Sequence, residues 1–157
     1  MNKKSENLQA VNPAAPGGNP GTLDILIMSF GYKEGPPPTA NVVFDVRFLK
    51  NPYWVEELRP LTGLDKPIQD YVLQQELAQE FLESAVGMMK TLLPRLVEME
   101  IKEFSIAFGC TGGQHRSATL VEVLANRLQE IFPHFKISKQ HRELPETCGS
   151  EQMIAEG

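Results

Sequence analysis

The sequence predicts one α/β domain, a layered sheet of about four mainly parallel strands with flanking helices. Short apolar runs alternate along the chain with amphipathic helical patterns, which is the order that joins parallel strands through crossovers. The 157 residues are 41% hydrophobic, enough for one ordinary core. Polar or glycine-bearing sequences follow several of the runs, as expected where parallel strands end at a common, ligand-binding edge.

The predicted strands cover residues 23–30, 41–48, 102–110 and 134–142. Residues 1–21 are rich in Asn, Pro, Gly and charge without periodicity, which predicts a disordered leader. Residues 146–157 have a similar composition and predict a flexible tail. The domain is therefore expected to span residues 22–145.

A long helix is expected before the third strand, because apolar residues recur there at intervals of three and four. The predicted core-facing stripe consists of Leu77, Phe81, Ala85, Met88, Leu92 and Leu96. Pro94 lies inside this pattern, and proline removes a backbone donor and crowds the preceding turn. We therefore expect the helix to kink or restart at Pro94.

Composition excludes several functional classes. The formal net charge of -5 makes the surface as a whole repel nucleic acid and anionic membranes, so binding of a polyanion needs a local basic patch. No apolar run approaches the length of a bilayer span, and the two cysteines, Cys110 and Cys148, follow no secretory segment. These features predict a cytoplasmic protein without membrane contact. No C-x-x-C or H-x-x-x-H spacing predicts a metal site, and no cofactor is expected.

The segment "CTGGQHRS", Cys110 to Ser117, joins the third strand to the following helix. Gly112 and Gly113 permit positive φ angles and bring backbone amides close together. Amides at a helix start are unpaired and carry the positive end of the helix dipole, so such a turn suits phosphate or carboxylate.

The other side chains of this segment strengthen the prediction of an anion site. Thr111 and Ser117 offer hydroxyl donors, Arg116 offers a planar fork that matches two phosphate oxygens, and Gln114 lies between them. His115 can donate to the same anion or transfer a proton. The alternative is an ordinary helix cap with Arg116 solvated. The Walker A pattern does not fit, because Gln114, His115 and Arg116 occupy its Gly, Lys and Ser/Thr positions.

Catalysis is a second alternative, because Cys110, Arg116 and Ser117 have the C-x5-R-[S/T] spacing of cysteine-dependent phosphatases. In those enzymes a thiolate attacks a phosphate that the loop amides and the arginine hold. Gly109 stands where that family usually has histidine. Asp45, at the end of the second strand, is the candidate general acid.

The other strand ends supply the predicted pocket wall. Asp45 and Arg47, two apart in the predicted strand, either contact ligand or form a salt bridge. Tyr53 and Trp54, after the Asn51-Pro52 turn, either cover a ligand or pack. The small basic group near the C-terminus either forms a positive mouth with Arg116, Arg47 and Lys50 or remains a solvated surface, which is the default for such charges. It comprises Lys136, Lys139, His141 and Arg142. The predicted wall comprises Ser29, Asp45, Arg47, Asn51, Tyr53, Arg59, His141 and Arg142.

Four motifs in order, "SFGYKEG", "VFDVRFLKNPYW", "ELRPLTGLDKP" and "GCTGGQHRS", span about residues 23–142. Together they resemble the C-terminal domain of the RNase adapter protein RapZ family. The resemblance implies a sugar-kinase-like α/β fold that binds glucosamine 6-phosphate and presents small regulatory RNA to an endonuclease. A P-loop nucleotide-binding domain normally precedes that domain, and nothing here matches it.

The resemblance implies a phosphosugar pocket at Cys110, Thr111, Gly112, Gly113, His115 and Arg116. The function it predicts is a regulatory, non-catalytic module that captures an amino-sugar phosphate and contacts RNA or a protein partner, either nucleotide-binding or nuclease. Homo-oligomerisation stays open. Tyr53 stands where the family often has histidine, and Gln114 where lysine is common. The missing cation weakens the expectation of RNA binding.

Overall fold

The computed structural model describes residues 21–146 and contains one parallel sheet. Its strands are β1 (Asp24–Gly31), β2 (Val42–Asp45), β3 (Glu103–Cys110) and β4 (Lys136–His141), in the spatial order β2-β3-β1-β4. This arrangement confirms the predicted fold class. The predicted leader and tail lie, apart from Gly21 and Glu146, outside the described residues.

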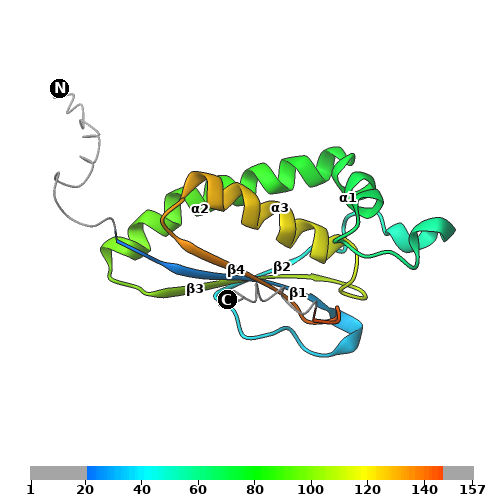
Figure 1. The fold of residues 1–157 in the computed structure, drawn as a ribbon, viewed down its shortest axis with the longest axis horizontal. Helices are drawn as coiled ribbons and strands as arrows, with labels where there is room; N and C mark the ends of the chain where they lie inside the picture. The colour runs from blue at the N-terminus through cyan, green and yellow to red at the C-terminus, as the bar shows by residue number, and fades with distance from the viewer. Residues whose placement is uncertain (1–20, 147–157) are drawn as a thin grey trace, which may run out of the picture.

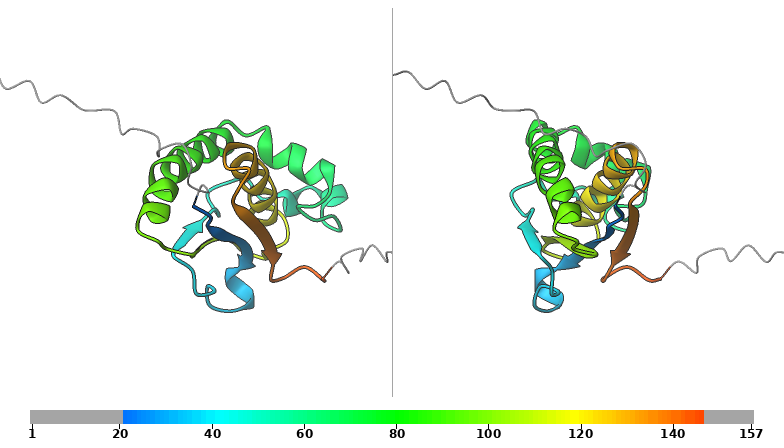
Figure 2. Two further views of the ribbon diagram at one scale, coloured as in Figure 1. Left: turned by 60° about the vertical axis from the view of Figure 1, so that its left-hand side comes forward. Right: turned by 90° about the vertical axis from the view of Figure 1, so that its left-hand side faces the viewer.

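The helices α1 (Lys66–Leu73), α2 (Glu76–Glu98) and α3 (Arg116–Ile131) lie on one face of the sheet (Figure 1). The segment that follows β1 contains the short 3-10 helix η1 (Tyr32–Glu34) and lies on the opposite face (Figure 2). Two further 3-10 helices, η2 (Pro52–Trp54) and η3 (Glu56–Leu58), lie between β2 and α1. The segment after β1 and the helix after β3 therefore lie on opposite faces of the sheet.

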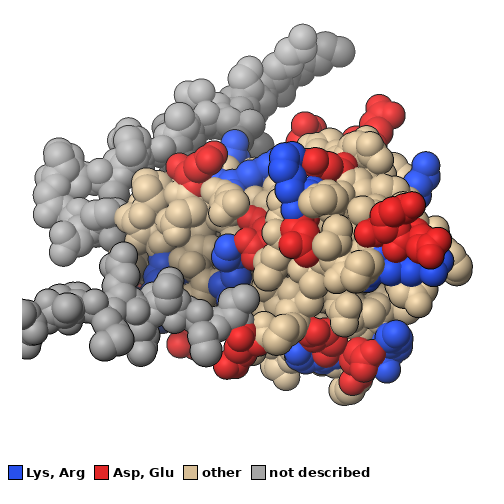
Figure 3. All heavy atoms as spheres, turned by 45° about the vertical axis from the view of Figure 1, so that its right-hand side comes forward, with Lys and Arg blue, Asp and Glu red and all other residues tan. Residues whose placement is uncertain are grey.

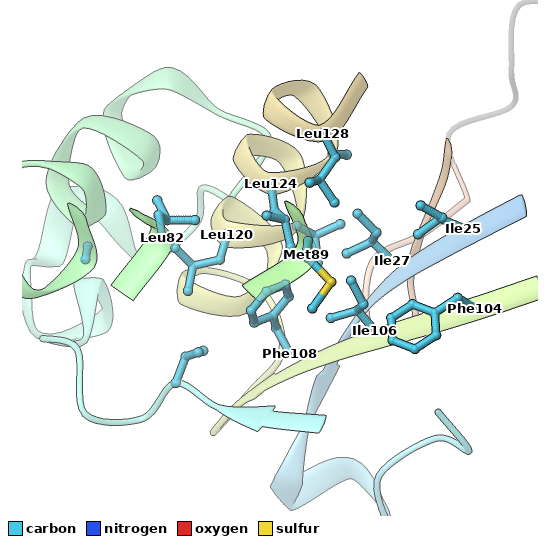
Figure 4. Close-up of a cluster of buried hydrophobic side chains, with 14 of the residues drawn as sticks. Ile25, Ile27, Leu82, Met89, Phe104, Ile106, Phe108, Leu120, Leu124 and Leu128 are labelled. Atoms are coloured by element: carbon cyan, nitrogen blue, oxygen red, sulfur yellow. The ribbon is translucent and has the colours of Figure 1, made fainter. Parts of the chain in front are cut away.

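The core lies between the sheet and the helices (Figure 4). Ile27 of β1 and Ile106 of β3 face Leu124 of α3, and all three side chains are fully buried. Each such side chain contributes roughly 1.5–3 kcal/mol by leaving water. Because α3 buries residues from its first turn to Leu128, packing fixes its amino-terminal end directly beside the end of β3.

The predicted face of α2 is correct at Ala85 but is displaced by about one residue elsewhere. The buried side chains are Ala78, Leu82, Ala85, Met89 and Leu93. Leu77 and Met88 are instead 56% and 48% exposed, whereas Phe81, Leu92 and Leu96 are partly buried against the core. Adjacent apolar pairs run along this helix, so its sequence periodicity does not determine which member of each pair faces the sheet.

The expected restart at Pro94 is also wrong, because α2 continues from Glu76 to Glu98. Proline removes only one intrahelical hydrogen bond, and it does so in the last turns of a long helix. The neighbouring Leu93 is fully buried. Tertiary packing on both sides of Pro94 therefore maintains the helix.

Candidate functional site

The segment 111–115 lies at the carboxyl end of the two central strands, where Gly31 of β1 pairs with Cys110 of β3. It leads directly into α3, which begins at Arg116. Ligands of open α/β sheets bind at this edge. The predicted phosphate segment thus occupies the expected place, and we refer to residues 110–117 as the glycine loop.

Gly113 is required by the architecture of the glycine loop. Its φ of +74° lies in the left-handed region that favours glycine, and an added Cβ would lie 2.5 Å from the backbone nitrogen of Gly31. A Cβ on Gly31 would in turn lie 2.5 Å from the carbonyl carbon of Gly112. The loop therefore packs backbone against backbone on the end of β1.

Gly112 is different. Its φ lies outside the left-handed region, and the only atom within 4 Å of an added Cβ is Cε of Lys33, at 4.0 Å. Neither backbone conformation nor packing within the described residues calls for glycine at this position. Gly112 lines a hollow of about 310 Å³, so the missing side chain leaves room for something to approach its backbone.

This hollow, which we call the loop hollow, has a volume suited to a small metabolite. The glycine loop lines it with Cys110, Thr111, Gly112, Gln114, His115 and Arg116. Two other segments complete it with Lys33, Glu34, Asn51 and Tyr53. The sequence did not predict a role for Lys33 or Glu34, although the motif "SFGYKEG" contains both.

Backbone donors are available around this hollow. No side chain caps α3, and within residues 21–146 the amides of Gly112, Gln114 and Arg116 have no acceptor. The amide of Gly113 donates to Sγ of Cys110 at 3.2 Å. Free amides at a helix start, with the helix dipole behind them, attract an anion.

Arg116 is directed into the glycine loop. Its side chain is buried, and Nη1 donates to the carbonyl oxygens of Arg47 at 3.1 Å and Leu49 at 2.9 Å. Nη2 makes one long bond, 3.3 Å, to Oγ1 of Thr111, and the buried Nε has no acceptor among the described residues. The side chain is thus fixed through Nη1, while the Nε–Nη2 edge that binds oxyanions in a bidentate manner is nearly unused.

The positive charge of Arg116 has no ionic partner among the described residues. A buried charge is costly unless it is paired and hydrogen-bonded. The solvated Arg116 of the helix-cap alternative is therefore absent, because only 4% of this residue is exposed.

His115 has a structural contact that the sequence did not predict. Its Nε2 donates to the carbonyl oxygen of Leu61 at 2.6 Å, which requires the proton to be on Nε2. Burial lowers the pKa of His115, and the charge of Arg116 lowers it further, although bonds to the backbone of Leu61 and Arg59 oppose the shift. The neutral imidazole therefore anchors the segment around Leu61, and Nε2 is not free to donate to an anion.

A second anchor explains the motif "LTGLD". The amide of Gly63 donates to the carbonyl oxygen of Gln114 at 2.7 Å, and an added Cβ would lie 2.5 Å from the amide nitrogen of Thr119. The segment from β2 to α1 is therefore attached to the glycine loop through Arg116, His115 and Gln114. The distance in sequence between this motif and the glycine loop gives no indication of the contact.

Cys110 is buried and lies beneath the loop. Its Sγ is 3.1 Å from Oγ of Ser117 and accepts the Gly113 amide. These contacts suit either a structural thiol or the nucleophile of the phosphatase alternative. Asp45, the candidate acid, does not line the loop hollow. Hydrogen bonding to Arg47 lowers the pKa of Asp45, with a further contribution from Arg116, and an ionised carboxylate cannot donate a proton.

Asp45 and Arg47 form the predicted salt bridge, with 2.6 Å between Nη2 of Arg47 and Oδ2 of Asp45. The expected strand geometry is wrong, however, because β2 ends at Asp45 and Arg47 lies in the following turn. The turn closes through the Arg47 amide, which donates to Oδ1 of Asp45 at 3.0 Å. The guanidinium of Arg47 lies 4.1 Å above the ring of Tyr32.

Asn51 and Tyr53 line the loop hollow, whereas Arg59 does not. Asn51 Oδ1 accepts the amide of Tyr53 at 3.1 Å and so fixes the start of η2. Arg59 Nε donates to the carbonyl oxygen of Tyr53 at 2.7 Å, and its guanidinium lies over the ring of Tyr53. Arg59 therefore supports Tyr53 from outside the hollow.

Ser29, His141 and Arg142 do not line the loop hollow. Ser29 is fully buried and shares a 2.7 Å hydrogen bond with Nδ1 of His141, whose Nε2 donates to Glu122 at 2.8 Å. Glu122 also accepts from Lys139 at 2.5 Å. We call Ser29, Glu122, Lys139 and His141 the β4 clamp, because they connect β4 to α3 and β1.

The positive mouth that the sequence allowed does not include Arg142 or the residues of β4. Arg142 pairs with Glu143 at 2.7 Å and donates to the carbonyl oxygens of Gly31 and Pro36. Lys136 pairs in register with Asp24 at the opposite, amino-terminal end of β1. The sequence reading missed the two glutamates, Glu122 and Glu143, that neutralise this region.

Lys and Arg alternate with Asp and Glu over the face drawn in Figure 3, so no broad surface of one sign covers that face. Residues 21–146 contain no group of three or more His, Cys, Asp or Glu side chains that could hold a metal ion. None of the described helices is long and apolar enough to cross a membrane.

Comparison with known proteins assigns the chain to a family. A family model described as the RapZ C-terminal domain matches residues 23–145. Nucleotide-binding proteins of Corynebacterium diphtheriae, Lactobacillus acidophilus and Bifidobacterium adolescentis are 43%, 44% and 50% identical over 76%, 78% and 72% of this chain. The matches cover 40%, 41% and 36% of those proteins, so the chain spans about two fifths of their length. The chain belongs to the RapZ C-terminal domain family.

Proposed function

We propose that this chain is a regulatory, non-catalytic module that captures the phosphate of a small metabolite in the loop hollow. The observation that carries the proposal is the buried guanidinium of Arg116, whose Nε has no acceptor and whose charge has no ionic partner among the described residues. Phosphate supplies two acceptors and the missing negative charge at once. The relatives' common name, nucleotide-binding protein, also concerns phosphorylated ligands.

Gly112 supports the same proposal from steric grounds. The space next to its Cα belongs to the loop hollow, and its amide has no acceptor within residues 21–146. A phosphate oxygen that accepts from backbone amides must approach the main chain closely, which a Cβ hinders. Lys33, whose side chain is largely exposed, adds a second cation to the wall.

The metabolite we propose is an amino-sugar phosphate such as glucosamine 6-phosphate. Glu34 is the single carboxylate among the residues that line the loop hollow, and its nearest cation, Lys33 Nζ, is 3.9 Å away. A ligand that carries both a phosphate and an ammonium group therefore finds Arg116 for its phosphate and Glu34 for its ammonium group. The resemblance to the RapZ family points to the same ligand.

Thermal stabilisation by ligands tests this proposal, because a ligand that binds only the folded state raises its stability. We expect inorganic phosphate and glucosamine 6-phosphate to raise the Tm of the chain, and glucose 6-phosphate to be weaker than its amino analogue. Glu34→Gln should remove the difference between the two sugars. An unchanged Tm with every phosphate compound would overturn the proposal.

We propose further that the occupied loop changes a surface for RNA or a protein partner, either nucleotide-binding or nuclease. Arg116 and His115 connect the loop to the segment between β2 and α1, so an anion that reorients Arg116 also acts on that segment. RNA binding should decline steeply with added salt. The buried free thiol of Cys110 suits the reducing cytoplasm in which we place this protein.

A phosphatase using Cys110 is the second candidate. The Gly113 amide that donates to Sγ favours it, as does the Ser117 hydroxyl 3.1 Å from Sγ. In that case Cys110→Ser should abolish hydrolysis of a phosphate ester while phosphate still raises the Tm. Turnover that is unaffected by Cys110→Ser would eliminate this candidate.

A further inference from the structure

A second hollow lies beside the loop hollow. Its volume is about 530 Å³, and it shares Asn51, Thr111 and Arg116 with the loop hollow. Its other walls carry Lys50, Trp54 and Tyr71. Because Arg116 belongs to both hollows, a phosphate bound to it can carry one substituent into each of them.

Trp54 is the most exposed large apolar side chain of the described residues, at 77%. None of the aromatic or cation–π contacts found within residues 21–146 involves its indole. Its backbone is nevertheless fixed, because the Trp54 amide donates to the carbonyl oxygen of Asn51 at 3.2 Å and the preceding Pro52 is buried. An open aromatic face on a rigid turn is suited to stacking against a planar ring.

Lys50 supplies a charge at the same place. Its Nζ forms no ion pair among the described residues, although its backbone amide is fixed by Oε1 of Gln75 at 2.8 Å. Arg47, in the same wall, is already paired with Asp45. The second hollow therefore combines two cations that have no ionic partner among the described residues, Lys50 and Arg116, with the open aromatic face of Trp54.

We propose that the second hollow binds a nucleoside diphosphate group, with its base stacked on Trp54 and its phosphates between Lys50 and Arg116. This inference rests on the proposed function, because one phosphate lies at the glycine loop. A free sugar monophosphate leaves the second hollow empty. A diphosphate that joins a base to a sugar fills both hollows.

The experiment uses Trp54 as its own reporter, since it is the only tryptophan in the sequence. Phosphate, pyrophosphate, UDP and ADP are titrated against the full chain, and both tryptophan fluorescence and Tm are recorded. We expect all four to raise the Tm, and only UDP and ADP to quench the fluorescence. Trp54→Ala should weaken UDP and ADP roughly tenfold, the scale of one base stacked on an aromatic side chain, and leave pyrophosphate unchanged.

Two controls separate the second hollow from the loop. Trp54→Phe keeps a stacking face and should retain most of the UDP affinity, and Lys50→Gln should weaken pyrophosphate without removing the quenching by UDP. If phosphate raises the Tm but UDP neither quenches nor binds more tightly, the second hollow is wrongly assigned and the loop proposal stands. If no phosphate compound binds, both fail. Quenching by a single-stranded oligonucleotide but by neither nucleotide would overturn the small-molecule assignment.

Discussion

Two polar clusters lie at the carboxyl end of the sheet, and they differ in how completely the protein satisfies them. In the β4 clamp the carboxylate of Glu122 accepts from Lys139 and His141, and His141 also bonds Ser29. In the glycine loop Arg116 lacks an ionic partner and its Nε lacks an acceptor within residues 21–146. Both clusters contain histidine and cationic side chains, so residue types alone do not tell them apart. The unsatisfied donors and charge mark the candidate site.

The largest loss of stability should come from substitution of Gly113, which the loop needs whether it is an anion site or only a helix cap. Gly113→Ala places a Cβ at a positive φ and 2.5 Å from the backbone of Gly31, so neither atom can yield easily. We expect a loss of roughly 2–3 kcal/mol in the free energy of unfolding, measured with urea. An unchanged midpoint would show that the loop does not pack on β1 as described.

The next largest effect concerns the β4 clamp. Glu122→Gln removes the charge that holds Lys139 and His141 and replaces one of the two acceptor oxygens by an NH2 donor, which should cost about 1–2 kcal/mol. Asp70→Asn is the control, since its pair with Lys66 is exposed and such pairs contribute at most about 1 kcal/mol. Equal effects of the two substitutions would remove the distinction between clamp and surface. Binding of phosphate should be unaffected by either.

Acidification should act on the two clusters in different pH ranges. The pKa of His115 is lowered by burial, so the unfolded chain binds a proton that the folded chain resists, and stability is lost as the pH falls below the ordinary value of 6.5. The pKa of Glu122 is lowered by its bond to His141, so its contribution is lost only below its ordinary value of 4.5. His115→Gln should therefore flatten the pH dependence of Tm as the pH falls below 6.5. A slope identical to that of the parent chain would contradict this.

The sequence predicted the sheet and the place of the glycine loop because both are local in origin. Apolar runs determine the strands, and a parallel arrangement brings their ends to one edge. The face of α2 could not be predicted, since adjacent apolar pairs such as Leu77 and Ala78 satisfy either phase. Tertiary contacts determine which residue of each pair faces the sheet.

The pocket wall was predicted only in part, for a related reason. Ser29, His141 and Arg142 lie near the carboxyl edge of the sheet. Glu122, the partner of His141, is placed by the packing of β4 against α3, which the sequence does not reveal, whereas Glu143 adjoins its partner Arg142 in the sequence. Lys33 and Glu34 enter the loop hollow because the chain after β1 folds under the sheet. Their position inside the motif "SFGYKEG" was the feature of the sequence that could have indicated them.

The smallest expected change in stability provides the most direct test of phosphate capture. Gly112→Ala adds one methyl group where the protein leaves space, so the free energy of unfolding should change by less than about 1 kcal/mol. Phosphate and glucosamine 6-phosphate should then no longer raise the Tm, whereas both should raise that of the parent chain. A Gly112→Ala variant that is equally stable and equally stabilised by phosphate would contradict the claim that the loop receives an anion.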